Sequence, residues 1–275
     1  MNSQLHSGLQ WKYKPPARLI LILRGRPCRY ARCKFCALPS QALPDISDEE
    51  FREAVERGLR QIQVPKEIEL HEVFIYNFGN GLDPKNLPPS VLESVISWCR
   101  RRHPSLQLVS LENRPNAAYG FSSENLARVE MLLGKIQPEL AIGYETKDDM
   151  LRNRVLRKGL SQRAFDKALG LLGQRGWWAR VYLMLKSAPS IEDTEAQEEL
   201  LKGAAFVLEL GEKHSVPTRT HMNVTYVARG TDMEQWFREG IYAPPSLECI
   251  QDTFRQLKYI DPCAILGDDD EGLGL

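Results

Sequence analysis

This sequence lacks long hydrophobic runs, an excess of charge of one sign and a signal-like N-terminus. The longest apolar runs, such as residues 19–23, are far shorter than the roughly 20 residues of a membrane helix. Lysine plus arginine equals aspartate plus glutamate at 36 each, which argues against a surface that binds nucleic acid everywhere but permits a local basic patch. Residues 1–8 are polar and contain no apolar h-region. We therefore expect a cytoplasmic protein with no membrane association.

Metal-spaced histidines and paired cysteine sets are also missing. The chain has six cysteines, which in a reducing compartment do not predict a disulfide framework. Cys99, Cys249 and Cys263 stand alone, as small buried hydrophobic side chains do. The other three cysteines fall within one short segment, and such clustering indicates a metal site.

Short apolar runs alternate with helical patterns along the chain. Strands are expected at residues 19–23, 73–76, 106–111, 140–143, 181–185 and 220–227. Helices are expected at residues 48–61, 90–101, 122–133, 162–175 and 194–213, with one or two more over residues 232–258. Ser47 and Glu50 form a capping box at the start of the first helix.

Six strands, each followed by a helix, predict an α/β fold with a parallel sheet. Because two strand–helix units are missing from a closed eight-fold barrel, we expect a partial (βα)6 TIM-like barrel. Its chemistry should lie in the loops that follow the strands. One core domain is expected over residues 19–260, preceded by an N-terminal extension (1–18) and followed by an acidic tail (261–275) that we expect to be disordered.

The loop after the first strand carries Cys28, Cys33 and Cys36 in the spacing C-x4-C-x2-C. Three thiolates from one loop can hold an iron–sulfur cluster, and three ligands leave one iron of a four-iron cluster open. Neighbouring arginines and a lysine favour the thiolate form. A structural zinc ion, which needs a fourth and distant ligand, and unligated cysteines remain open alternatives.

These residues resemble the radical S-adenosylmethionine (SAM) superfamily, whose usual signature is C-x3-C-x2-C with an aromatic residue before the last cysteine, here Phe35. The chain departs from it by one extra residue between the first two cysteines. It is more similar to the Elp3-like branch, and within it to the radical SAM enzyme of archaeosine formation in tRNA and its relatives. The resemblance rests on the longer cysteine spacing with Tyr30 and on segments 75–83, 143–146, 158–159, 182–186, 223–231 and 242–245, and it covers about residues 19–258.

The resemblance implies a [4Fe-4S] cluster on the three cysteines and a SAM site around it. The segment after the second strand would bind the amino group of SAM, and its residues here are Asn77, Gly79, Asn80 and Gly81; an ordinary strand–helix turn is the alternative. Glu145 with Arg157, or with Lys158 in its place, would bind the ribose and carboxylate of SAM, against an ordinary surface ion pair. Phe35 in the cysteine loop and the polar rim residues Lys186 and Asn223 are further candidates for contact with the cofactors, and no catalytic residue can be named.

The activity that the resemblance implies is reductive cleavage of SAM to methionine and a 5′-deoxyadenosyl radical, with an external reductant supplying the electron. The substrate would be a tRNA nucleoside. Since the net charge is zero and no separate RNA-binding module is visible, a partner protein would then supply RNA binding. The alternative class is a non-catalytic protein, either an iron–sulfur electron carrier or a zinc-stabilised interaction protein.

Overall fold

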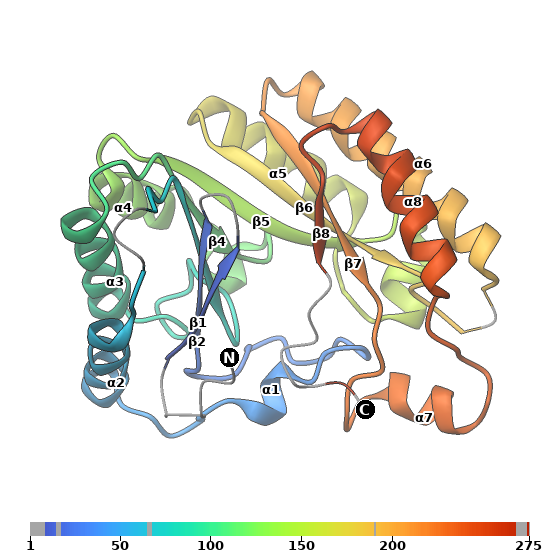
Figure 1. Ribbon diagram of the computed structural model, residues 1–275, viewed down its shortest axis with the longest axis horizontal. Coiled ribbons are helices and arrows are strands. Elements are labelled where there is room, and N and C mark those ends of the chain that lie inside the picture. The colour runs from blue at the N-terminus through green and yellow to red at the C-terminus, as the bar shows by residue number, and fades with distance from the viewer. Residues whose placement is uncertain (1–8, 15–17, 65–67, 190, 268–273, 275) are drawn as a thin grey trace. The chain divides into compact units, whose positions relative to one another are not determined.

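Figure 1 shows the computed structural model of the chain, which describes residues 9–14, 18–64, 68–189, 191–267 and 274. The chain divides into two compact units. Unit 1 comprises residues 1–31 and 38–140, and unit 2 comprises residues 32–37 and 141–275. The eight described strands follow one another in chain order in the sheet, from β1 to β8. Strand β5 (Gln137–Glu145) begins in unit 1 and continues into unit 2.

Unit 1 is a layer of strands with helices packed together beside it. Strand β1 (Leu9–Lys14) pairs antiparallel with β2 (Arg18–Leu23), and β2 pairs parallel with β3 (Glu72–Asn77), which pairs parallel with β4 (Leu108–Glu112). The helices are α1 (Leu38–Gln41), α2 (Asp48–Gln61), α3 (Pro89–Arg102) and α4 (Ser123–Leu133). Helix α3 packs between α2 and α4.

Local sequence explains these elements. Leu19, Leu21 and Leu23 of β2 are fully buried, as expected of a continuous apolar run in a parallel sheet. Helix α2 begins at the expected capping box: the Ser47 side chain accepts from the Glu50 N–H at 3.2 Å, and the Glu50 carboxylate accepts from the Ser47 N–H at 2.9 Å.

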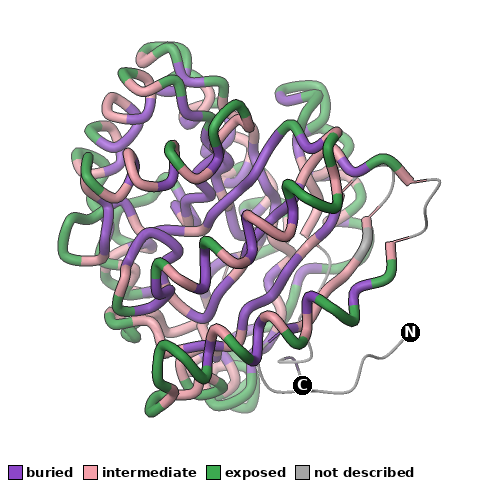
Figure 2. The backbone as a smooth tube through the Cα atoms, turned by 90° about the vertical axis from the view of Figure 1, so that its left-hand side faces the viewer, coloured by how far each residue is buried: buried purple, intermediate pink, exposed green. Residues whose placement is uncertain are grey.

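Unit 2 repeats the pattern. Its strands β6 (Trp178–Leu185), β7 (Thr218–Val224) and β8 (Ile265–Gly267) pair in parallel. A π-helical turn (Leu151–Val155) precedes α5 (Gln162–Gln174), and the later helices are α6 (Asp193–Lys213), α7 (Asp232–Arg238) and α8 (Leu247–Ile260). Helix α6 packs on β6, β7 and α8. In Figure 2 the buried residues follow the strands and one side of each long helix.

The six expected strands and the helices between them are present, with ends that differ by a few residues. Two strands were not expected. Strand β1 lies within the expected N-terminal extension, although its sequence LQWKYK alternates apolar and polar residues, which is the period of a half-buried strand. Strand β8 lies within the expected tail and is only three residues long, too short to show a period. Residues 268–271, the acidic part of that tail, lie outside the described residues.

Within the described part of the chain, no helix combines the length and the apolar composition that crossing a membrane requires.

Candidate functional site

The first half of the cysteine loop belongs to unit 1, where the loop after β3 holds it. The Asn86 amide donates to the Pro27 carbonyl at 2.5 Å, directly before Cys28. The Arg29 guanidinium pairs with the buried Asp83 carboxylate at 2.6 Å. The Asn80 amide donates to the Cys28 sulfur at 3.9 Å. The loop after β3 therefore positions the first of the three cysteines.

The loop after β4 holds the same segment from another side. The Arg114 guanidinium lies 3.8 Å from the centre of the Tyr30 ring, within cation–π range. The Tyr30 and Tyr119 rings meet edge to face with centroids 5.9 Å apart. Ala31, at the end of this segment, has a positive φ of 42°. The conformation around Tyr30 is thus fixed by side chains from a loop far along the chain.

The second half of the cysteine loop belongs to unit 2. The Lys34 N–H donates to the Leu156 carbonyl at 3.0 Å, and the Lys34 ammonium pairs with Asp232 at 2.6 Å. Phe35 packs against an apolar cluster formed by Leu156, Met184, Val227, Met233 and Tyr242. Phe35 therefore anchors Cys33 and Cys36 to the core of unit 2. Its expected contact with a cofactor stays a prediction.

The segment after β3 contains four of the expected SAM-binding residues. Asn77 is buried at the end of the strand, and both polar atoms of its side chain lack a hydrogen-bond partner among the described residues. A buried amide without partners is costly, which is what a site for a polar ligand would show before the ligand binds. Asn77 is therefore the expected residue whose surroundings most favour a ligand contact.

The two glycines of this segment have packing reasons of their own. A Cβ on Gly79 would lie 2.5 Å from the Asn86 side chain, and a Cβ on Gly81 would lie 3.0 Å from the Glu112 carbonyl. The Gly81 N–H also donates to that carbonyl at 2.7 Å. Close approach to neighbouring protein groups thus explains both glycines. Their expected role in cofactor binding stays a prediction.

In unit 2, Glu145 and Lys158 form a buried ion pair. The Glu145 carboxylate and the Lys158 ammonium are 2.6 Å apart, with side chains 5% and 13% exposed. Gly143 makes room for the pair, since a Cβ there would lie 2.4 Å from both charged groups. Arg157 is exposed. Of the two cations considered for Glu145, the structure pairs it with Lys158, and burial distinguishes this pair from an ordinary surface ion pair.

Three of the expected site residues of unit 2 adopt left-handed backbone conformations. The φ angles are 69° at Glu145, 51° at Arg157 and 60° at Lys186. Such conformations cost about 1–3 kcal/mol for residues other than glycine and cluster at functional sites. Glu145 ends β5, and Lys186 directly follows β6 and pairs with Asp193 at 2.7 Å. The strain thus lies where the catalytic loops of such a fold begin.

A polar cluster on β6 and β7 surrounds His221. The buried Arg180 guanidinium donates to the Tyr182 hydroxyl at 2.9 Å and lies 2.8 Å from His221 Nδ1. Because a guanidinium only donates, Nδ1 accepts and the proton of a neutral His221 lies on Nε2. The half-buried Asn223 follows on the same strand, and the backbone of Gly267 lies close to both Asn223 and His221.

Sequence reasoning missed Asn86, Arg114 and Arg180. Asn86 acts on a carbonyl 59 positions earlier and Arg180 on a histidine 41 positions later. No spacing rule covers such distances. The only available signal was position, since Asn86 and Arg114 lie in loops that follow expected strands.

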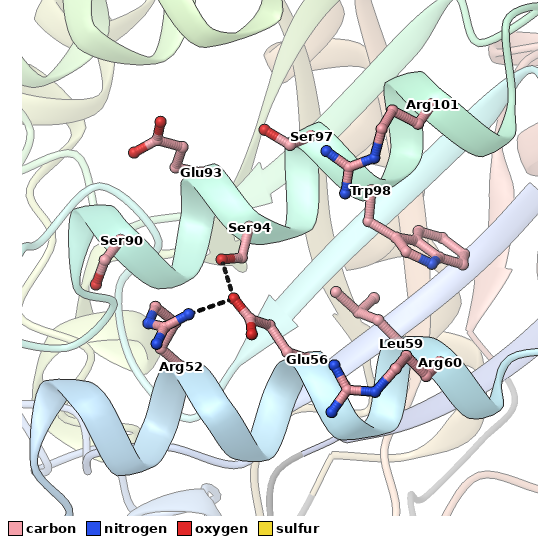
Figure 3. Close-up of a pocket in the computed structure, with 10 residues that line it drawn as sticks. All are labelled: Arg52, Glu56, Leu59, Arg60, Ser90, Glu93, Ser94, Ser97, Trp98 and Arg101. Atoms are coloured by element: carbon pink, nitrogen blue, oxygen red, sulfur yellow. Dashed lines mark hydrogen bonds and ion pairs between the residues drawn. The ribbon is translucent and has the colours of Figure 1, made fainter.

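A separate groove of about 490 Å³ lies between α2 and α3 of unit 1 (Figure 3). Arg52 and Ser94 both donate to the Glu56 carboxylate there, at 2.6 and 2.9 Å. None of the expected site residues lies in this groove. Its lining combines basic, acidic and hydroxyl side chains with Leu59 and Trp98, and consists of Arg52, Glu56, Leu59, Arg60, Ser90, Glu93, Ser94, Ser97, Trp98 and Arg101.

The donor set of the cysteine loop fits an iron–sulfur cluster. Cys28, Cys33 and Cys36 are half-buried and form no disulfide. Across the described residues, no three His, Cys, Asp or Glu side chains converge as ligands of a single metal ion. A four-iron cluster offers a separate iron to each cysteine and does not need such convergence.

No protein-family model matches the chain. It is 25% identical over 276 residues to archaeosine synthase subunit beta of Methanosarcina acetivorans, covering 99% of this chain and 74% of that protein.

Among solved structures, the chain resembles queuine lyase from Clostridium spiroforme bound to SAM and queuine, with a TM-score of 0.63, 17% identity and 98% of both chains covered. It also resembles Elp3 from Methanocaldococcus infernus, with a TM-score of 0.59, 14% identity, and 82% of this chain and 54% of that chain covered. These similarities confirm the expected resemblance to archaeosine synthase subunit beta and, in fold, to Elp3. The chain has the α/β, TIM-barrel-type fold of the radical SAM enzymes, as the sequence predicted.

Proposed function

We propose that this chain is a radical SAM enzyme that acts on a tRNA nucleoside together with a partner subunit. The observation that carries the proposal is the loop after β2, which presents three half-buried cysteines, none in a disulfide, in a chain with the radical SAM fold. Cys28, Cys33 and Cys36 would hold a [4Fe-4S] cluster with one iron open for SAM. When bound and reduced by an external reductant, such a cluster would supply the electron for cleavage of SAM to methionine and a 5′-deoxyadenosyl radical.

The residues around the strand ends would bind and orient SAM. The buried, unpartnered amide of Asn77 suits the amino acid part of SAM, with Gly79 and Gly81 beside it. Glu145, oriented by Lys158, suits the ribose hydroxyls, and Arg157 suits the carboxylate because its planar guanidinium can pair with both oxygens. Lys186 and Asn223 would complete the rim. Phe35 would hold the cysteine loop against the core.

Similarity to a protein named as a subunit of archaeosine synthase supports both the tRNA substrate and the partner. The queuine lyase structure was solved with SAM and queuine bound, which favours a modified nucleobase as the reacting group. The equal numbers of basic and acidic residues suit an enzyme that shares RNA binding with another protein.

The test of the enzyme class is anaerobic reconstitution with iron and sulfide, followed by reduction with SAM and an assay for 5′-deoxyadenosine. We expect brown protein that produces it. Cys33→Ala should lose both cluster and product, whereas Cys263→Ala, at an exposed cysteine, should lose neither. Protein that holds zinc instead, or a cluster inert towards SAM, would favour an interaction protein or an electron carrier.

The substrate is tested separately by tRNA binding at about 50 mM and about 200 mM salt, with and without the partner subunit, because phosphate contacts weaken steeply as salt rises. We expect salt-dependent binding that the partner strengthens. Absence of binding in every condition would remove tRNA as the substrate while leaving the SAM assay unaffected.

A further inference from the structure

We propose that Asn80 is a positioning residue for the cluster rather than a ligand of SAM: its amide donates a hydrogen bond to the Cys28 sulfur and raises the reduction potential of the bound cluster. This inference rests on the cluster of the proposed function. It goes beyond that function by assigning a residue that tunes it.

The hydrogen-bond network fixes which way the Asn80 amide points. The backbone N–H of Arg114 donates to Asn80 Oδ1 at 2.8 Å. A backbone N–H cannot accept, so the carbonyl end of the amide must face Arg114. The NH₂ end therefore faces Cys28 Sγ, 3.9 Å away. Asn80 is 1% exposed, so water does not compete for this donor.

Both ends of this contact are held in place. Asn86 accepts from the Asn80 N–H at 3.4 Å and donates to the Pro27 carbonyl at 2.5 Å. Asn86 thus ties the residue before Cys28 to the backbone of Asn80. Gly79 leaves room for the Asn86 side chain, because a Cβ there would lie 2.5 Å from it. Asn86 thus fixes the geometry, and Asn80 makes the contact with the Cys28 sulfur.

A cluster ligand is a thiolate, and an ionised acceptor makes a stronger hydrogen bond than a thiol. The 3.9 Å distance is long for a sulfur acceptor, and charge on the sulfur would strengthen the contact. Reduction adds one negative charge to the cluster, so a donor stabilises the reduced state more than the oxidised one. Hydrogen bonds to the sulfurs are one of the terms that set cluster potentials. Loss of the Asn80 donor should therefore make the cluster harder to reduce.

The test is a redox titration of the reconstituted protein monitored by electron paramagnetic resonance, without SAM, for Asn80→Ala and Asn80→Asp. Asn80→Ala removes the donor without adding charge and is the deciding variant. Asn80→Asp keeps the oxygen that accepts from Arg114 but replaces the donor by a carboxylate oxygen, whose negative charge would itself lower the potential. The matched control is Asn113→Ala, because Asn113 is also buried and its amide donates to the backbone carbonyl of Arg114 at 2.6 Å rather than to sulfur. Iron content is measured for every protein.

We expect all variants to retain iron, both Asn80 variants to titrate at more negative potential than the wild type, and the control to titrate with the wild type. Reduction potentials equal to that of the wild type in both Asn80 variants would overturn this inference and leave the proposed function standing. Loss of iron from both Asn80 variants but not from the control would also overturn it, since Asn80 would then serve assembly. Absence of iron from the wild type would overturn the proposed function and this inference with it.

Discussion

Replacing Lys158 by methionine will leave the Glu145 carboxylate buried without its counter-ion. The two groups are 2.6 Å apart, and the glutamate side chain is only 5% exposed. Methionine has a similar length but donates no hydrogen bond. Breaking a buried ion pair from one side costs about 3–5 kcal/mol. Because Lys158 retains some exposure, we expect the lower part of that range, about 3 kcal/mol of the free energy of unfolding.

A double-mutant cycle separates this charge effect from lost packing. Glu145→Gln, added to Lys158→Met, removes the unpaired carboxylate and should restore most of the stability, because neutral replacement of a buried pair is often tolerated. We expect an interaction energy of about 2 kcal/mol, well above the roughly 0.5 kcal/mol scatter of independent mutations.

The assay is urea unfolding at pH 7 followed by circular dichroism. Lys202→Met is the control, since Lys202 pairs with Glu198 at 3.0 Å on the surface, where both side chains are about 70% exposed, and should leave stability unchanged. A free energy of unfolding of Lys158→Met equal to that of the wild type would refute the argument that burial makes this ion pair strong. Additive effects of the two substitutions in the cycle would also refute it.

Three further predictions concern other parts of the chain. Burial raises the pKa of Glu199 despite its hydrogen bonds, so the folded protein holds this proton more tightly than the unfolded chain does. The free energy of unfolding of the wild type, relative to that of Glu199→Gln, should therefore fall as the pH rises above about 4.5. Parallel pH profiles of the two proteins would contradict this. Burial raises the pKa of Cys99 to about 12, so iodoacetamide at pH 8 should label Cys263 but not Cys99 in the native protein, as peptide mass mapping will show; labelling of both at equal rates would disprove it. Gly79→Ala should lower the free energy of unfolding by about 1–3 kcal/mol because its Cβ collides with a buried amide, whereas Gly203→Ala in the middle of α6 meets only ordinary contacts and should be neutral or stabilising by up to about 1 kcal/mol; urea unfolding distinguishes them.

The order of most strands and helices, the capping box of α2 and the three-cysteine loop after β2 could all be read from the sequence. These features depend on residues that are neighbours in the chain, whose period, spacing and capping pattern can be read directly. Strand β8 was missed because three residues show no period. Strand β1 was missed although its alternation of apolar and polar residues is the period of a strand.

Which distant side chains meet could be seen only once the chain was folded. The tertiary structure paired Glu145 with Lys158 and left Arg157 exposed, packed Phe35 against the core of unit 2, and directed the Asn80 amide to Cys28. In the last case a backbone N–H that the Arg114 loop presents selects the amide orientation. No local pattern in the sequence gives these contacts, because they join residues that are 13 or more positions apart in the chain and meet only after folding.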